Sequence, residues 1–224
     1  MKILIINPNS DAEMTAAIQE SAEAFAGGSF QVTTVSTPGA PPFIESHASE
    51  IQCGPGMLRL MEEHEWDFDA FVIACHSDVN IEAVRETTRK PVIGIGEASM
   101  KLASFLGRTF SVVTTHRHSV PGKLEQIRKL HLQDQVVSVR PPNPGDEGLG
   151  GVDLFMELAR RARNEDGAEV IVLGCAGLAG MDRAIRESLE MPVLDGVVCA
   201  LILATGFARG GMGTSKVLYY SPEF

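Results

Sequence analysis

Three features that would indicate other kinds of protein are missing from this 224-residue sequence. No stretch approaches the roughly 20 apolar residues that span a bilayer, and the apolar run in the opening MKILIINPNS is too short for a secretory signal. Positive charge is not in excess, since 19 basic and 29 acidic residues give a net charge of -10. That balance argues against unassisted binding to nucleic acid or to an anionic membrane. These absences predict a cytoplasmic protein with a small-molecule partner.

Paired cysteine motifs and nucleotide-binding motifs are also missing. The chain has four cysteines, Cys53, Cys75, Cys175 and Cys199. They show neither a CxxC nor a Cys/His metal spacing, so in a reducing compartment we expect free thiols and no metal site. Gly94 and Gly96 in GIGEAS are too few for a dinucleotide fingerprint, and there is no P-loop. Thiols with a chemical role remain possible.

Short apolar runs alternate with amphipathic stretches along the chain. Strands are expected at 3–6, 30–36, 71–74, 92–95, 110–115, 136–139, 170–174 and 193–196. Helices are expected at 14–25, 57–65, 81–88, 99–106, 123–130, 152–163, 182–189 and 197–204. Continuous Val/Ile-rich runs separated by helices are typical of parallel strands covered on both faces. The pattern therefore predicts an α/β protein.

The second half of the chain repeats a pattern of the first. DFDAFVIAC, then AVRE, then PVIGI is answered by GAEVIVLGC, then AIRE, then PVLDG. Cys75 and Cys175 lie 100 residues apart, and Pro91 and Pro192 lie 101 residues apart. A unit of strand, cysteine, helix, proline and strand thus occurs twice.

This repeat predicts two similar lobes, each a parallel β-sheet flanked by helices, related by a pseudo-twofold with the active site in the cleft between them. KILIINPNS is echoed in the same way by TFSVVTTHR, each a strand that ends in small polar residues. We expect residues 1–98 plus 206–224 to form the first lobe, and residues 99–205 to form the second.

Cys75 and Cys175 each stand where a predicted strand ends. Open α/β sheets bind ligands at the carboxyl ends of their strands, so facing lobes would place both thiols in one cleft. Free cysteines also fill sheet cores, but the matched positions favour a functional pair. A thiolate and a thiol on opposite faces of a carbon can remove one proton and return another. We expect a helix that begins after each cysteine to lower its pKa from the ordinary value of about 8.5.

Such a pair suits a substrate with an acidified carbon–hydrogen bond, such as a ring carbon between a carbonyl and a nitrogen. A delocalised carbanion needs neither a metal nor an organic cofactor. Backbone amides that follow the cysteines, at His76 and Ser77 and at Ala176 and Gly177, are expected to bind carbonyl oxygens and stabilise the enolate.

Several motifs in fixed order carry a family resemblance. INPNS, VIACHSD followed by EAVRE, PVIGIGEAS, FSVVTT, VLGCAG and PVLDGV together resemble the Asp/Glu/hydantoin racemase superfamily, in particular its hydantoin and allantoin racemase branch. The resemblance runs from residue 3 to about residue 205. It implies a cofactor-independent racemase of 5-substituted hydantoins or allantoin, with Cys75 and Cys175 as the acid/base pair and a homo-oligomeric assembly.

The resemblance also implies that Asn9, in INPNS, and Thr115, at the end of FSVVTT, contact the substrate. A second interpretation of INPNS is helix initiation, because its serine begins an S-x-x-E capping box, SDAE. The stretch 37–49 is rich in Pro, Gly and Ser and is expected to be a loop over the cleft, with Phe43 as an apolar wall.

The sequence departs from the family directly after the first cysteine. Family members commonly carry Phe there and Asp-Pro-Gly a few residues on, whereas here His76 follows Cys75, and Val79 and Asn80 follow Asp78. His76 is expected to contact a more polar or anionic substrate or, if protonated, to raise the thiolate fraction of Cys75.

The remaining candidates are expected to have no chemical role. His116 and His118 alternate along an extended segment without further metal ligands, which indicates the surface or an oligomer interface. Cys53 is expected in the loop and Cys199 in an apolar helix, away from the strand ends.

Three other functions remain open from the sequence. The protein could be a related amino-acid racemase, or a cysteine-dependent decarboxylase or cis-trans isomerase of small dicarboxylic acids. It could also be a non-catalytic module that binds a small molecule in the same cleft. Uptake of solvent deuterium at the substrate carbon separates the racemases from the binding module.

Overall fold

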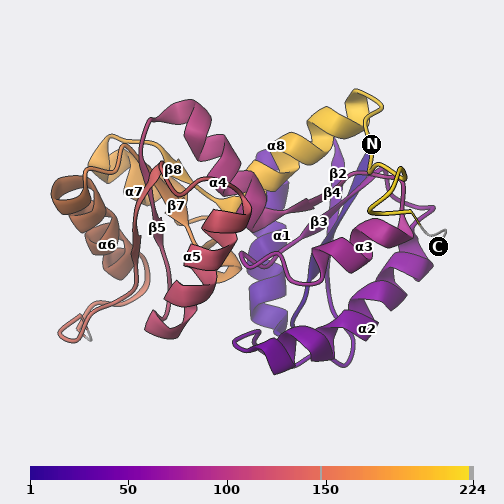
Figure 1. Cartoon of the computed structure of the whole chain (residues 1–224), viewed down its shortest axis with the longest axis horizontal. Helices are drawn as coiled ribbons and strands as arrows, with labels where there is room; N and C mark the ends of the chain where they lie inside the picture. Colours follow the sequence, from indigo (N-terminus) through magenta and orange to yellow (C-terminus); the bar gives the residue numbers. More distant parts are fainter. Residues whose placement is uncertain (147, 222–224) are drawn as a thin grey trace.

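Two four-stranded parallel sheets, one in each of two lobes, form the framework of the protein (Figure 1). The computed structural model describes residues 1–146 and 148–221. The first sheet contains β1 (Lys2–Asn7), β2 (Gln31–Ser36), β3 (Ala70–Ile73) and β4 (Val92–Gly94). The second contains β5 (Phe110–Val113), β6 (Val136–Arg140), β7 (Val170–Leu173) and β8 (Val193–Leu194). The strand orders β2-β1-β3-β4 and β6-β5-β7-β8 are equivalent, which confirms the predicted fold of two similar α/β lobes.

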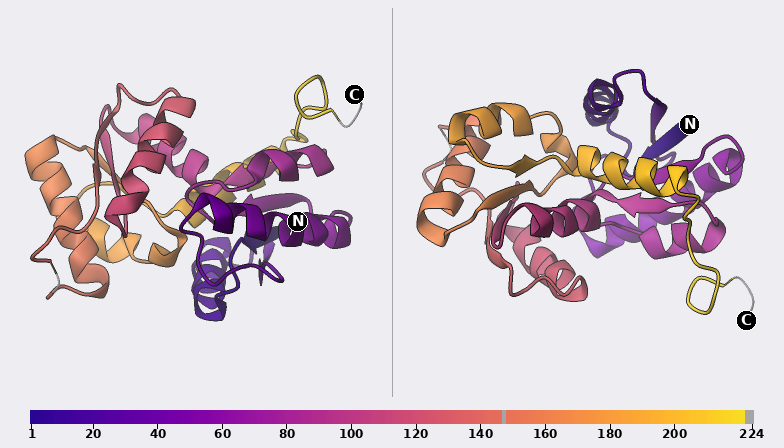
Figure 2. Two further views of the ribbon diagram at one scale, coloured as in Figure 1. Left: turned by 60° about the horizontal axis from the view of Figure 1, so that its bottom comes forward. Right: turned by 90° about the horizontal axis from the view of Figure 1, so that it is seen from above.

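Helices cover the faces of both sheets. The first lobe contains α1 (Ala12–Ala26), α2 (His47–His64) and α3 (Ile81–Thr87). The second contains α5 (Val120–Lys129), α6 (Gly151–Asp166), α7 (Asp182–Leu189) and the 3-10 turns η1 (Arg117–Ser119) and η2 (Ala176–Leu178). Two further helices, α4 (Ile95–Leu106) and α8 (Gly196–Arg209), pack against each other where the lobes meet (Figure 2). None of the described helices is both long and apolar enough to cross a bilayer.

The central strands are buried on both faces, as their unbroken apolar runs predict. In β1, Ile3 and Ile5 pack in one cluster with side chains of α1, α4 and α8. Leu4 and Ile6 point to the opposite face and pack with side chains of α2 and α3. Because both faces are filled, ligands have access to the sheet at the ends of its strands.

The last helix, α8, packs on the first sheet. Its apolar face, which includes Val197, Ala200 and Leu201, belongs to the same buried cluster as Ile3 and Ile5. The chain therefore returns to the first lobe at α8, earlier than the boundary that the sequence analysis places after residue 205. The apolar pattern of this helix fits either sheet, and its packing identifies the first one.

Helix α1 begins one residue later than the capping box predicts. Its N-cap is Asp11, whose carboxylate accepts a hydrogen bond from the backbone N–H of Met14 at 2.8 Å. Ser10 precedes the cap, so the prediction of an SDAE capping box is wrong. A carboxylate stabilises a helix start in two ways: it accepts hydrogen bonds from free backbone N–H groups, and negative charge there interacts favourably with the helix dipole.

Helix α2 begins much earlier than its apolar pattern predicts. Ser46 caps it, and Ser49 completes a capping box with Ser46. The loop over the cleft therefore ends at Ser46. Cys53 lies buried inside α2 rather than in the loop, so that prediction is wrong. Pro55 lies inside this helix, whose buried face includes Cys53, Gly56 and Met57.

The two cysteines of the repeat emerge at equivalent edges of the two sheets. Cys75 follows the end of β3 and Cys175 follows the end of β7. In the parallel registers, Ile73 pairs with Ile6 of β1, and Leu173 pairs with Val113 of β5. The segments after β1 and β5 therefore arrive at the same edges as the two thiols, which places INPNS and the end of FSVVTT beside them.

Candidate active site

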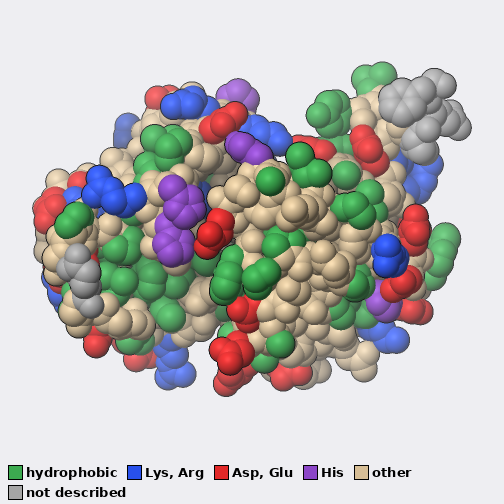
Figure 3. Space-filling view, turned by 90° about the horizontal axis from the view of Figure 1, so that it is seen from below, with side chains coloured by type: hydrophobic (Ala, Val, Ile, Leu, Met, Phe, Trp, Pro, Cys, Tyr) green, Lys and Arg blue, Asp and Glu red, His purple; other side chains and the backbone are tan. Residues whose placement is uncertain are grey.

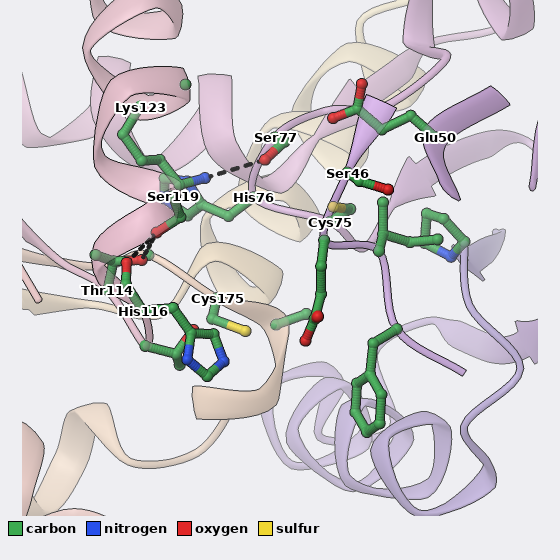
Figure 4. Close-up of a pocket in the computed structure, with 18 of the residues that line it drawn as sticks. Ser46, Glu50, Cys75, His76, Ser77, Thr114, His116, Ser119, Lys123 and Cys175 are labelled. Atoms are coloured by element: carbon green, nitrogen blue, oxygen red, sulfur yellow. Dashed lines mark hydrogen bonds between the residues drawn. The ribbon is translucent and has the colours of Figure 1, made fainter. Parts of the chain in front are cut away.

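A cavity of about 460 Å³ lies between the lobes, and both strand-end cysteines line it (Figure 4). This volume lies within the range of small-molecule sites. Eight of the nine residues that the sequence analysis assigns to the site line the cavity: Asn9, Phe43, Cys75, His76, Ser77, Thr115, Cys175 and Ala176. The ninth, Gly177, lies next to Cys175 but is not among the lining residues.

Cys75 is a half-buried thiol whose surroundings disfavour its charged form. Burial raises its pKa to about 11, while the Lys123 ammonium and a backbone hydrogen bond from Ser77 oppose that increase. The charges of Cys175 and Asp78 raise the pKa further, so the two thiols influence each other. The expectation that a following helix lowers this pKa is therefore wrong for Cys75. Helix α3 begins only at Ile81, and burial outweighs the remaining favourable contacts.

Cys175 is held at the end of β7 by a close approach of two strands. A Cβ at Gly174 would lie 2.7 Å from the carbonyl oxygen of Val113, so only glycine fits there. Cys175 then precedes the turn η2, and its carbonyl accepts a hydrogen bond from Leu178 N–H at 3.1 Å. The thiol is half-buried and faces the cavity from the lobe opposite Cys75 (Figure 4).

His76 is almost fully buried, with 2% of its surface exposed, and both of its ring nitrogens have partners. Nδ1 lies 2.9 Å from the Lys123 Nζ, and Nε2 lies 3.2 Å from the Ser99 Oγ. Burial, and then the charge of Lys123, lower the pKa of His76 well below its usual value. The imidazole is therefore neutral at pH 7, which removes the alternative that a protonated His76 favours the Cys75 thiolate. Substrate contact by His76 stays a prediction.

Lys123 is the functional candidate that the sequence analysis missed. This α5 residue is 4% exposed, and its Nζ lies 3.4 Å from the Ser77 Oγ in addition to contacting His76 (Figure 4). Among the described residues that line the cavity, Lys123 is the sole lysine or arginine. One signal was present in the sequence: Lys123 shares the buried face of α5 with Ile127, four residues later.

A half-buried carboxylate, Asp78, fixes the loop that follows Cys75. Its oxygens accept hydrogen bonds from the backbone N–H groups of Gly96 at 2.9 Å and Glu97 at 2.7 Å, at the start of α4. Burial, followed by the charge of Glu97, raises the pKa of Asp78 to about 7. A Cβ at Gly94 would overlap the Asp78 carboxylate, so the glycines of GIGEAS make room for this loop rather than for a dinucleotide.

The asparagines of INPNS contact both the start of α1 and the cavity. The Nδ2 of Asn7 donates to the Oδ1 of Asn9 at 2.7 Å and to the Oγ1 of Thr15 at 3.0 Å, which ties the loop to α1. Asn9 also lines the cavity, and its Nδ2 contacts the Met14 sulfur at 3.3 Å. A contact with the start of α1 and a place in the cavity lining are therefore compatible, and substrate contact by Asn9 stays a prediction.

The mouth of the cavity is formed by exposed side chains of both lobes. His116 and His118 stack with ring centroids 5.3 Å apart, and they line the cavity as well as reaching the surface. Phe43, 49% exposed, and Glu50 lie on the first-lobe side. Histidine and acidic side chains gather where the lobes meet on this face (Figure 3). Within residues 1–146 and 148–221, no three His, Cys, Asp or Glu side chains are grouped so that they could hold a metal ion.

Comparison with known proteins gives consistent results. Residues 3–204 match the family described as Asp/Glu/Hydantoin racemase. A hydantoin racemase from Pseudomonas sp. (strain NS671) is 36% identical, covering 100% of this chain and 92% of that protein. A hydantoin racemase from Rhizobium meliloti is also 36% identical, covering 99% of this chain and 94% of the relative. The structure of an allantoin racemase from Klebsiella pneumoniae is similar with a TM-score of 0.92 and 31% identity, covering 100% of this chain and 94% of that chain. The chain belongs to the Asp/Glu/hydantoin racemase family.

Proposed function

We propose that this racemase interconverts the enantiomers of 5-substituted hydantoins or of allantoin by proton transfer between the substrate C5 and two thiols, Cys75 and Cys175. The observation that carries the proposal is that these cysteines come from opposite lobes and line one cavity. Support for the substrate class comes from the relatives, two hydantoin racemases and an allantoin racemase, which this chain matches over nearly its full length.

Each turnover moves one proton at each face of the substrate carbon. The thiolate of one cysteine removes the proton from C5, and the electron pair is delocalised into the ring carbonyl as an enolate. The thiol of the other cysteine then donates its proton to the opposite face of C5. The first cysteine ends as a thiol and the second as a thiolate, so the enzyme is ready for the opposite enantiomer.

The polar lining is suited to a planar, neutral ring with carbonyl and N–H groups. Ser77, Thr114, Thr115 and Asn9 supply hydroxyl and amide groups around the cavity. Backbone N–H groups beside the two strand ends are the donors that would stabilise the enolate oxygen, because they are fixed before the charge develops. Binding in this half-buried site also limits access of water to the thiolate.

The proposal is tested by replacing each cysteine separately. Cys75→Ala and Cys175→Ala are expected to lower racemisation of 5-substituted hydantoins and allantoin by about 10²–10⁴-fold, the range of a lost acid or base. Chiral chromatography measures the rate from either enantiomer. Cys53→Ala and Cys199→Ala are matched controls, because both thiols are buried elsewhere, and their rates are expected to stay near the parental rate. Parental racemisation by the Cys75 or Cys175 variant would overturn the proposal.

A further inference from the structure

Two pseudo-equivalent helices present different side chains to the two cysteine loops. Helix α5, which follows β5, places Lys123 against His76 and Ser77 in the Cys75 loop. Helix α1, which follows the equivalent strand β1, places Met14 at the Cys175 loop, where its Cε would lie 3.5 Å from a Cβ at Gly177. The repeated fold thus supplies an ammonium beside one loop and an apolar thioether beside the other.

We propose that Lys123, positioned by His76, is the counter-charge of the Cys75 thiolate, so that Cys75 depends on this lysine much more than Cys175 does. This inference rests on the proposed function, because it concerns the same two thiols. Lys123 and His76 are positioning residues here: Lys123 acts through the charge state of Cys75, and His76 acts through Lys123.

The donors and acceptors available on each group determine which group donates in the series of hydrogen bonds that holds Lys123. An ammonium can only donate, so the Nδ1 of His76, 2.9 Å from the Lys123 Nζ, accepts. The Nε2 then carries the proton and donates to the Ser99 Oγ at 3.2 Å, and the Ser99 hydroxyl donates to the Ile95 carbonyl at 2.7 Å. The imidazole N–H and the Ser99 O–H each have an acceptor, which stabilises a neutral imidazole beside a charged lysine. A phenylalanine at position 76 would leave the buried ammonium without this acceptor.

The charged and titratable groups around Lys123 favour its pairing with Cys75. Burial lowers the pKa of Lys123, and negative charge on Cys75, Asp78, Cys175 and Glu50 opposes the decrease, with Cys75 the strongest of the four. Around Cys75, the corresponding groups are Lys123, Cys175 and Asp78, of which Lys123 alone favours the thiolate. A thiolate at Cys75 therefore has one cationic partner among these groups.

The first test measures thiol reactivity and does not require a substrate. Iodoacetamide alkylates thiolates, and mass spectrometry of the peptides separates Cys75 from Cys175. In Lys123→Met, alkylation of Cys75 at pH 8 is expected to slow by about tenfold or more, because a nearby opposite charge shifts a pKa by about 1–3 units. Alkylation of Cys175 is expected to change by less than about threefold.

Conservative variants and a matched control separate charge from packing. Lys123→Arg keeps the charge and is expected to retain most of the Cys75 reactivity. His76→Phe is expected to lower it, whereas His76→Gln, which keeps an acceptor, restores part of it. Lys129→Met removes an exposed lysine from the same helix and is expected to leave both thiols unchanged. Thermal unfolding checks that each variant is folded. If Lys123→Met does not fold, the reactivity of Cys75 in the two His76 variants tests the proposal.

The second test follows solvent-deuterium exchange at C5 in single-cysteine enzymes. With Cys175→Ala, Cys75 alone exchanges the proton of one enantiomer, and adding Lys123→Met is expected to slow this exchange by about tenfold or more. With Cys75→Ala, the same lysine variant is expected to leave exchange of the other enantiomer within about threefold. Equal effects on both cysteines, or no effect on Cys75 in either test, would overturn the role of Lys123. If the parent enzyme racemises no hydantoin, the proposed function fails, but the alkylation test still decides the role of Lys123.

Discussion

Gln126 of α5 donates a hydrogen bond from its Nε2 to the Oδ2 of Asp78 at 2.8 Å, which joins the second lobe to the loop that follows Cys75. Lys123 lies three residues earlier on the same helix and contacts His76 in that loop. Helix α5 therefore holds the Cys75 loop at two points. The position of one proposed acid/base group depends on contacts across the junction of the lobes.

Removing the Gln126 contact is expected to lower stability and activity together. In Gln126→Met, the half-buried Asp78 carboxylate loses one donor, and the free energy of unfolding is expected to fall by about 1–3 kcal/mol. Racemisation at saturating substrate is expected to fall as well, because the Cys75 loop is less firmly positioned. Arg128→Gln, on the exposed face of the same helix, is the control. Urea unfolding and chiral chromatography measure both effects, and a Gln126 variant that resembles the control in both would contradict this account.

The glycine at position 96 is expected to tolerate no side chain. A Cβ there would overlap the carbonyl oxygen of His76 and crowd the Nε2 of Gln126. Gly96→Ala is therefore expected to lower the free energy of unfolding by about 1–3 kcal/mol, as overpacking does. Gly206→Ala, in an exposed turn of α8 with open space around it, is expected to raise stability by about 0.5–1 kcal/mol. Similar changes in stability for the two variants would show that the surroundings of position 96 can accommodate a Cβ.

The rate of racemisation is expected to rise with pH. Burial raises the pKa of Cys75 to about 11, so its thiolate becomes populated at higher pH than that of an ordinary thiol. A reaction that needs one thiolate is expected to show kcat/KM rising by up to about tenfold per pH unit between pH 6 and 8. The pH profile of kcat/KM reports the free enzyme. A profile that is flat or falls over this range would show that ionisation of a thiol with a raised pKa does not control kcat/KM.

Ionisation of Asp78 is expected to lower stability as the pH rises. Burial raises its pKa to about 7 in the folded protein, from an ordinary value of 3.8. Between these values the folded state binds more protons than the unfolded state, so stability from this group is present at low pH and is lost towards pH 7. The free energy of unfolding of the parent, minus that of Asp78→Asn, is therefore expected to decrease from pH 4.5 to pH 7.5. A difference that grows with pH would mean that the carboxyl pKa is lowered instead.

Local sequence patterns were sufficient to predict much of the fold and the two cysteines. Unbroken apolar runs such as FVIAC and VIVLGC are typical of strands buried on both faces, and their repetition indicated two lobes that face each other. Since parallel strands end at the same edge of a sheet, the place of Cys75 and Cys175 followed from the strands. The sheets confirm this reasoning, because their strand orders are equivalent.

Contacts between distant parts of the chain could not be predicted in this way. Lys123 lies 47 residues from His76, and whether its long side chain turns inward depends on how the lobes meet. The pKa of Cys75 depends on burial by both lobes, which outweighs the helix that the sequence analysis expected to lower it. Helix α8 returns to the first sheet for a similar reason, since an apolar face does not specify which of two sheets it covers.

The most direct test of the two-thiol account is the position of the isotope during racemisation in D2O. Starting from one enantiomer of a 5-substituted hydantoin and stopping early, the product is expected to carry deuterium at C5, because it is protonated by an exchanged thiol on the opposite face. The recovered substrate is expected to keep its protium. Mass spectrometry after chiral separation measures both species. Product that retains protium, or deuterium distributed equally between product and recovered substrate, would indicate a single base and contradict the pairing of Cys75 with Cys175.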